Sequence, residues 1–361
     1  MKKERLDALR KCMEENRLDG LVVTKYVNLH YFSGFRGDDT TLVVTKDHAL
    51  LITDSRYVEQ AEAEAPLFCV VEQKEGLLKK TAEEITKLGC QNVGFEGNAL
   101  RYDDYRMLAK HLSGIRFDTS IHLDELRQVK DEEELALIRK ACAIADAAYR
   151  DIITFIRPGM TELAVAARLE RIMREEGAEK TSFDTIVASG LRGSMPHGTA
   201  TDKIIERGDF VTMDYGAKYK GYCSDMTRTI CVGKASERQK QVYDAVLHAQ
   251  EAALAAIAPG KSGKEIDAVA RRCLEAHDLA QYFGHGLGHS LGLEIHEEPR
   301  LSRFSKCEYL LPGMLVTDEP GVYIPSWGGL RIEDTVLVTK KGNERLTKSS
   351  KAFVEINLES Q

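Results

Sequence analysis

Two acidic residues in the second half of the chain have a spacing that could bring their carboxylates together. Asp214 and Asp225 lie in apolar runs that flank a short connection with a turn glycine, Gly221. If the chain turns between Tyr219 and Lys220, the aspartates face each other across paired antiparallel strands, with Cβ atoms about 5 Å apart. Like charges at that distance repel, so a folded protein must compensate them.

A second acidic pair repeats this arrangement roughly a hundred residues later. Glu319 and Glu333 are equidistant from Ser326, which lies in a loop that contains two glycines. Two opposed pairs of carboxylates are costly to bury unless cations bind among them or some of them stay protonated. Divalent metal ions are the natural compensation, because two such ions balance four carboxylates.

A neutral ligand is available in the glycine- and histidine-rich segment from Gly284 to His289. His289 can bind a metal ion through its imidazole, and the glycines permit close approach of the backbone. Four oxygen ligands and one nitrogen suit manganese first, with cobalt and zinc as alternatives, better than they suit a thiophilic ion. The residues therefore predict a hydrolase with two divalent metal ions.

The elements that position these residues follow from hydrophobic periodicity. Residues 1–125 alternate short apolar runs with amphipathic segments, which predicts an α/β domain with a covered sheet. Residues 126–361 contain two stretches in which the expected elements follow the same order. Each stretch has a helix that ends at Pro-Gly, a second helix and a hairpin, and the two hairpins lie at 209–232 and 314–338. We therefore expect an α/β (α+β) chain whose second domain has two related α-α-β-β halves.

Two helix starts are marked by capping boxes. Asp131 with Glu134 and Ser262 with Glu265 have the spacing at which each side chain caps the backbone amide of the other residue. We expect the first of these helices to open the second domain.

Composition excludes several classes of function. The chain has 361 residues and a net charge of −7, which suits two domains and gives no electrostatic reason to expect nucleic acid. No apolar signal segment follows Met1, and no apolar run is long enough to span a bilayer, so we expect a cytoplasmic protein with no membrane partner. Eight cysteines without a Cys-x-x-Cys pair argue against a thiolate zinc site and a disulfide framework, and we expect them reduced and mostly buried.

Five short motifs resemble the prolidase and aminopeptidase P branch of the M24 metallopeptidases. In chain order they run from Met213 to Ala217, Gly221 to Thr229, Gly284 to His289, Glu319 to Gly321 and Arg331 to Asp334. The resemblance extends from about residue 125 to the end, and the first 125 residues resemble the amino-terminal domain of that branch. It implies a pita-bread catalytic domain, a homodimer, and cleavage of the bond between an amino-terminal residue and a following proline.

The resemblance also implies a role for each metal ligand. Asp225 and Glu333 bridge two metal ions. Asp214 completes one metal site, whereas His289 and Glu319 complete the other.

Other residues are implied to act beside the metal ions without holding them. They are His197, His285, His296 and Arg331, of which Arg331 orients the ligands. We expect Glu319 to accept a proton from the attacking water. His285 and His296 would stabilise the oxyanion or carry the proton to the leaving imino nitrogen, and no protein nucleophile is needed.

One position departs from the family pattern. Asp318 stands where these proteins usually have an apolar residue, directly before Glu319. Because neighbouring side chains on a strand point to opposite faces, we expect Asp318 to alter packing and not metal binding.

Three alternative functions are weighed against this prediction. A methionine aminopeptidase would share the five ligands, but the amino-terminal domain and His285 favour the proline-directed branch. A binding module that has lost its metal ions, or a metal-free creatine hydrolase, is disfavoured because every ligand position is filled. Dipeptides and longer peptides with proline second both remain candidate substrates.

Overall fold

The computed structural model describes residues 3–356, and the chain folds as two compact units, residues 1–127 and 128–361. No helix within residues 3–356 combines the length and apolar character needed to cross a bilayer. The eight cysteines are all unpaired, and Cys90, Cys142, Cys223 and Cys231 are buried, whereas Cys69 is exposed.

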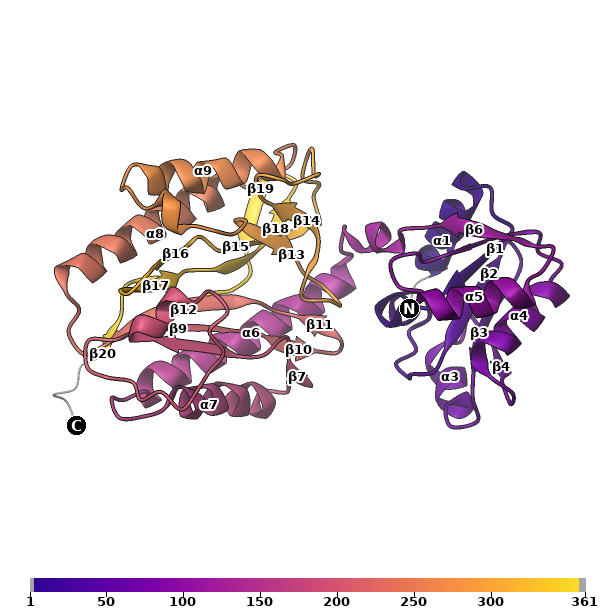
Figure 1. The fold of residues 1–361 in the computed structure, drawn as a ribbon, viewed down its shortest axis with the longest axis horizontal. Helices are drawn as coiled ribbons and strands as arrows, with labels where there is room; N and C mark the ends of the chain where they lie inside the picture. Colours follow the sequence, from indigo (N-terminus) through magenta and orange to yellow (C-terminus); the bar gives the residue numbers. More distant parts are fainter. Residues whose placement is uncertain (1–2, 357–361) are drawn as a thin grey trace. The chain divides into compact units, whose positions relative to one another are not determined.

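The first unit is a six-stranded mixed sheet with helices packed on it (Figure 1). Its strands lie in the order β4-β3-β2-β1-β5-β6, with bounds β1 Gly20–Val23, β2 Thr41–Thr45, β3 Ala49–Thr53, β4 Cys69–Glu72, β5 Asn92–Phe95 and β6 Arg116–Ser120. Its helices are α1 Lys3–Glu15, α2 Tyr26–Ser33, α3 Val58–Glu64, α4 Leu77–Lys87, α5 Tyr102–His111 and the 3₁₀ helix η1 Leu123–Arg127. Every residue of β1, β2 and β3 is buried, which confirms the predicted covered sheet.

The second unit places two helix pairs outside a layer of strands (Figure 1). The helices are α6 Glu132–Phe155, α7 Glu162–Glu175, α8 Glu237–Ala256 and α9 Gly263–Glu275, with the 3₁₀ helices η2 Gly190–Ser194 and η3 Ala280–Tyr282. One core lies between α6, α7 and the strands of the first half, and another between α8, α9 and the strands of the second half. The predicted pair of α-α-β-β halves is confirmed.

The strands of the second unit form several small sheets. The first half contains β7 Lys180–Thr181, β8 Ile186–Ser189, β9 Phe210–Tyr215, β10 Ala217–Tyr219, β11 Tyr222–Cys223 and β12 Met226–Val232. The second half contains β13 Gly288–Ser290, β14 Glu297–Leu301, β15 Leu315–Asp318, β16 Gly321–Ile324, β17 Gly328–Arg331, β18 Asp334–Thr339, β19 Gly342–Arg345 and β20 Glu355–Ile356. The central sheet has the order β20-β12-β9-β8, so strand β20 pairs with the first half.

Local sequence signals set the ends of these helices. Asp131 caps α6 and Ser262 caps α9, each in the predicted capping box. The helices α6 and α8 are each followed by a Pro-Gly step whose glycine, Gly159 or Gly260, has a positive φ of 90° or 83°. Glycine adopts that backbone conformation without a Cβ clash, so the chain can reverse direction there.

The first hairpin does not turn where we expected. Tyr219 pairs with Tyr222, so the turn residues are Lys220 and Gly221, whose φ angles of 46° and 87° are both positive. A two-residue turn with two positive φ angles matches the twist of the flanking strands. The prediction that Asp214 faces Asp225 directly is therefore wrong.

The register difference moves the first acidic pair by two residues. Asp214 is opposite Thr227, and Asp225 lies two positions nearer the turn. Since side chains on a strand alternate with a period of two, Asp225 keeps the face of Thr227 and still points toward Asp214. The two carboxylates are diagonal neighbours instead of direct partners.

The second hairpin has the predicted register. Asp318 pairs with Asp334 in the β15–β18 ladder, and Gly321 pairs with Arg331 in the β16–β17 ladder. Both ladders place Glu319 opposite Glu333, between the two paired segments. The symmetry about Ser326 is confirmed.

Asp318 is buried without compensation. Its side chain is fully buried, and neither carboxylate oxygen has a hydrogen-bond partner among residues 3–356. Burial, together with the negative charge of Asp334, raises the pKa of Asp318 well above its usual range. The folded protein therefore retains a proton on Asp318 at a pH where the unfolded chain has lost it.

This proton makes stability depend on pH. Because the pKa of Asp318 is raised on folding, its protonated form stabilises the fold at low pH, and that contribution is lost as pH rises above about 4, the unfolded value. At pH 8 we expect Asp318→Asn to have a larger free energy of unfolding than the wild type. The free energy of unfolding of the variant minus that of the wild type should be about 1–3 kcal/mol larger at pH 8 than at pH 5. Urea unfolding of both chelator-treated proteins at each pH measures this difference.

A matched control is Asp118→Asn, which changes an aspartate of strand β6 whose side chain is 60% exposed. That variant should track the wild type at both pH values. A stability difference for Asp318→Asn that is the same at pH 5 and pH 8 would contradict the assignment.

Candidate active site

One cavity of about 600 Å³ collects the residues that the sequence singled out. The predicted site residues that line it are His197, Asp214, Asp225, His285, His289, His296, Glu319, Arg331 and Glu333. They come from both halves of the second unit, from segments that are far apart in the chain. Asp318 does not line this cavity, in agreement with the expectation that it points away from Glu319.

The acidic residues and His289 form the centre of the cavity. Asp225, His289 and Glu333 each offer a ligand atom, and these atoms lie within 4.8 Å of one another. His289 Nε2 lies 3.4 Å from Glu319 Oε1 and 3.6 Å from Asp225 Oδ2. This spacing leaves room for an ion that each group could reach.

The imidazole of His289 is neutral and turned toward the carboxylates. Its Nδ1 lies 3.0 Å from the carbonyl oxygen of Ser290, which assigns the ring proton to Nδ1 and the lone pair to Nε2. Burial lowers the pKa of His289 to about 3. A neutral imidazole with an inward lone pair is the form that binds a metal ion.

In the metal-free protein, burial and mutual repulsion favour the protonated forms of these carboxylates. Burial and the charge of Glu333 raise the pKa of Asp225 well above its usual range, and burial and the charge of Glu319 do the same for Glu333. Burial raises the pKa of Glu319 to about 7. Asp214 Oδ1 is buried and has no hydrogen-bond partner among the described residues. Crowded carboxylates, an unpaired oxygen and a neutral imidazole fit divalent metal ions.

Arg331 holds the acidic residues in place. One of its terminal nitrogens donates to Asp214 Oδ2, and its Nε donates to Thr227 Oγ1 at 3.0 Å. The Thr227 hydroxyl in turn donates to Glu333 Oε2 at 2.6 Å. Arg331 therefore orients one carboxylate directly and a second through a hydroxyl, while Asp214 Oδ1 stays available.

Two of these contacts involve residues that the sequence analysis did not select. Thr227 lies two positions after Asp225, and the period of two along a strand could have identified it. Tyr323 accepts a hydrogen bond from Arg331 at 2.6 Å, and its hydroxyl lies 3.0 Å from Nε2 of His285. A single tyrosine in the apolar strand β16 gives no such signal, because it resembles an ordinary core residue.

The predicted histidines occupy different environments. The Nδ1 of His285 lies 2.8 Å from the carbonyl of Gly286, and burial lowers the pKa of His285 to about 4. His296 is exposed, and its ring packs edge-on against His289 with centroids 4.4 Å apart. His197 is also exposed. Thus His285 is half-buried with both ring nitrogens engaged, whereas His197 and His296 lie at the solvent side of the cavity.

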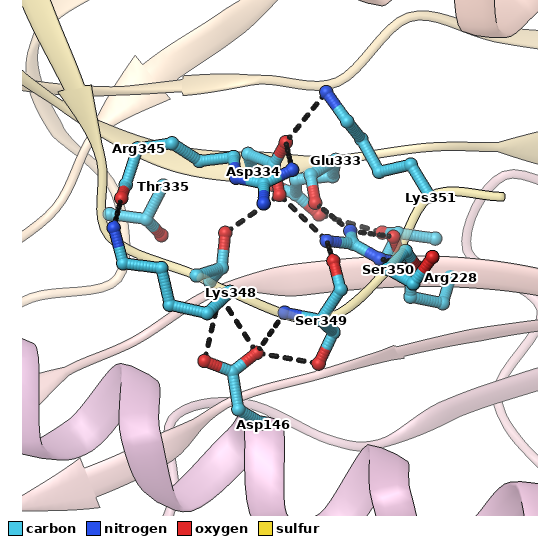
Figure 2. A network of polar contacts seen from close by, with 12 residues as sticks. Asp146, Arg228, Glu333, Asp334, Thr335, Arg345, Lys348, Ser349, Ser350 and Lys351 are labelled. Carbon is cyan, nitrogen blue, oxygen red and sulfur yellow. Dashed lines mark hydrogen bonds and ion pairs between the residues drawn. The ribbon is translucent and has the colours of Figure 1, made fainter.

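A second polar layer, centred on Arg228 and Asp334, contacts the backbone of Glu333 (Figure 2). The fully buried Arg228 donates to the carbonyl oxygens of Glu333 and Thr227 and pairs with Asp334 Oδ1 at 2.7 Å. Thr335 Oγ1 donates to the carbonyl oxygen of Asp225 at 2.8 Å. These bonds hold the backbone of Asp225 and Glu333 without using their carboxylate oxygens.

Helix α6 contributes to the same layer. Asp146 accepts hydrogen bonds from the backbone amides of Lys348 and Ser349, and Figure 2 shows it beneath the loop that they form. Lys351, from the end of that loop, lies 3.2 Å from Asp334 Oδ2. The loop that Asp146 holds thereby contacts the carboxylate oxygen of Asp334 that Arg228 does not use.

Comparisons with known proteins find two matching families along the chain. Residues 136–340 match metallopeptidase family M24, and residues 5–129 match the creatinase/prolidase N-terminal domain. The chain is 43% identical to an Xaa-Pro dipeptidase of Pyrococcus furiosus, over 98% of this chain and 100% of that protein.

Solved structures of similar proteins cover nearly the whole chain. An Xaa-Pro dipeptidase from Bacillus anthracis is 44% identical, with a TM-score of 0.95, over 98% of this chain and 99% of that one. An X-Pro aminopeptidase from Thermotoga maritima is 36% identical, with a TM-score of 0.90, over 97% of this chain and 99% of that one.

Binding of a divalent metal ion is expected to displace protons. At pH 6 the raised pKa values of Asp225, Glu319 and Glu333 mean that the metal-free protein holds protons in the cavity. Calorimetric titration of Mn²⁺ into chelator-treated protein, in two buffers with different ionisation enthalpies, should show proton release that decreases from pH 6 to pH 8.

The variant Glu319→Gln removes one titrating group and should release fewer protons at pH 6. Equal heats in both buffers at pH 6 would show that the carboxylates are already ionised without metal, contrary to this account.

Proposed function

This chain belongs to metallopeptidase family M24, and we propose that it hydrolyses the bond between an amino-terminal residue and a following proline. The observation that carries the proposal is the cavity lined by all the site residues that the sequence predicted. The similar proteins include an Xaa-Pro dipeptidase and an X-Pro aminopeptidase, which supports the proline-directed specificity.

The proposed ligands follow the arrangement of the cavity. We assign Asp225 and Glu333 as carboxylates that bridge two divalent ions, with Mn²⁺ as the preferred ion. Asp214 completes one site, and His289 and Glu319 complete the other. When bound, such ions lower the pKa of water and polarise the scissile carbonyl.

The proposal extends to the organisation of the whole chain. Residues 126–361 are assigned as the catalytic domain and residues 1–125 as the amino-terminal domain. A cytoplasmic homodimer also belongs to the proposal, and light scattering of the purified protein tests the dimer.

The chain's own residues bind the peptide and move its protons. Glu319 is the proposed acceptor of the proton that the attacking water loses, because its carboxylate lies in the cavity beside His289. His285 and His296 are assigned to stabilise the oxyanion or to carry the proton to the leaving nitrogen, and His197, which is exposed in the cavity lining, can also contact the substrate. Arg331 keeps Asp214 oriented throughout.

The walls of the cavity suit a proline ring. Phe183, Ile186, Pro196 and Ile295 contribute apolar surface beside the polar centre. Proline lacks an amide hydrogen, so a pocket that accepts it needs no acceptor at that point, and an ordinary peptide would leave its own N–H unpaired there.

We expect peptides with proline second to be cleaved at least about a hundredfold more efficiently than the same peptides with alanine second. That ratio corresponds to about 2.7 kcal/mol of differential transition-state binding. The values of kcat/KM for Ala-Pro and Ala-Ala, measured with added Mn²⁺, give the ratio directly.

Comparable rates on both peptides would remove the proline assignment but leave a metallopeptidase. Efficient cleavage only after an amino-terminal methionine would support a methionine aminopeptidase instead.

Arg300 favours dipeptides over longer substrates. It is opposite His289 in the β13–β14 ladder, and cross-strand partners share one face, so its side chain lies on the cavity side. Its Nε lies 3.5 Å from Glu298 Oε1, and the side chain is 51% exposed. A partly exposed guanidinium in the cavity lining suits the free carboxylate of a carboxy-terminal proline, which only a dipeptide presents next to the scissile bond.

We expect Arg300→Gln to raise KM for Ala-Pro by roughly 10- to 100-fold, the usual loss for one charged hydrogen bond, and to change KM for Ala-Pro amide little. The control Arg303→Gln changes an exposed arginine that is not among the cavity-lining residues. An equal loss on the acid and the amide would remove the carboxylate assignment.

A further inference from the structure

A buried ion pair lies at the entry to the catalytic domain. Lys130 Nζ is 3.0 Å from Glu297 Oε2 and 3.4 Å from Ser290 Oγ. The side chains of Lys130 and Glu297 are 1% and 6% exposed. A buried charge pair is costly to desolvate, and its net gain in stability is often small, so stability alone does not account for this pair.

Both partners of Lys130 lie directly next to histidines of the cavity. Ser290 follows His289, and Glu297 follows His296. Ser290 and Glu297 are themselves paired, after a register shift, at the end of the β13–β14 ladder where the connecting loop begins. The lysine therefore contacts the point at which the strands separate into the loop that carries His296.

Glu297 also ties down that loop. Its Oε1 accepts a hydrogen bond from the backbone amide of Glu294 at 3.2 Å, while its Oε2 contacts Lys130. The loop has further anchors, because the amide of Cys223 donates to the carbonyl of Gly292 at 2.8 Å and Lys218 Nζ donates to the carbonyl of Leu293 at 3.0 Å. His296 itself is exposed, so the position of its ring depends on the loop and on its contact with His289.

Ser290 connects the lysine to the metal-ligand candidate. The carbonyl of Ser290 accepts from His289 Nδ1 and sets the direction of Nε2, while the side chain of Ser290 contacts Lys130. A shift of this residue would rotate the imidazole of His289 relative to Asp225 and Glu319.

The backbone of Lys130 is itself held firmly. Its amide donates to the carbonyl of Gly313 at 2.9 Å, and Val129 forms a β-bridge with Met314. The next residue, Asp131, caps α6. Met314 directly precedes β15, which leads to Glu319, so Lys130 joins the segment before Glu319 to the segment that carries both histidines.

We propose that Lys130 is a positioning residue that holds His289 and His296 in register with the carboxylates through Glu297 and Ser290. The expected loss of activity rests on the proposed peptidase function. The expected loss of metal affinity does not depend on the substrate. A purely structural ion pair would affect folding alone.

The test must separate positioning from the cost of an uncompensated buried charge. Lys130→Met leaves the buried charge of Glu297 without the lysine, so this variant should be less stable. The double variant Lys130→Met/Glu297→Gln removes both charges, and its glutamine retains an acceptor for the amide of Glu294. We expect the double variant to recover most of the lost urea-unfolding midpoint.

The kinetic and metal-binding losses should remain in the double variant. We expect kcat for Ala-Pro to stay roughly 10- to 100-fold below wild type, with KM within about threefold, because losses of this size follow when supporting contacts of a metal ligand or catalytic group are removed. The affinity of chelator-treated protein for Mn²⁺, measured by calorimetry, should fall about tenfold.

The control Arg168→Met/Asp151→Asn removes an ion pair between α7 and α6, with Nε and Oδ1 2.6 Å apart, and should leave kcat and Mn²⁺ affinity unchanged. Recovery of kcat and Mn²⁺ affinity together with the unfolding midpoint would overturn the positioning role. If the wild type cleaves no Xaa-Pro peptide, the proposed function fails, and the Mn²⁺ affinity of the double variant still decides the role of Lys130.

Discussion

The mutual repulsion of four carboxylates in one poorly solvated cavity is the constraint on which the rest of this structure depends. Asp214, Asp225, Glu319 and Glu333 lie close enough that burial and their neighbours raise the pKa of three of them, Asp225, Glu319 and Glu333. Such a group is stable only if cations occupy the space between the oxygens or protons neutralise them. The surrounding chain must hold the acids in position without using up the oxygens that a metal ion needs.

The fold meets this requirement partly by holding the backbone of two of the acids, Glu333 and Asp225. Arg228 and Thr335 bond to the carbonyl oxygens of Glu333 and Asp225, and Asp334 anchors Arg228 in turn. Where side chains do contact these carboxylates, each uses a single oxygen: Arg331 donates to Asp214, Thr227 to Glu333 and Thr317 to Glu319. Two related halves supply one hairpin each, so the acids approach from opposite sides of the cavity.

Polar groups just outside the cavity also orient the histidines. His289 is oriented by the carbonyl of Ser290, and Tyr323 engages His285 together with Arg331. Lys130 reaches the histidine-bearing segment from the start of the catalytic domain. Lys130 and Arg228 are therefore each buried beside a carboxylate, whereas the carboxylate of Asp318 has no hydrogen-bond partner within residues 3–356 and its pKa is raised well above the usual range.

The sequence by itself determined the residue types, their order and several features that depend on neighbours a few positions away. The caps at Asp131 and Ser262 and the register about Ser326 follow from local rules of backbone geometry. Only the tertiary structure decided that the first hairpin turns at Lys220 and Gly221, and that Arg331 meets Asp214 across 117 positions of the chain. Turn geometry leaves several registers open by one or two residues, and contacts between distant segments depend on how whole elements pack, so periodicity and spacing do not contain them.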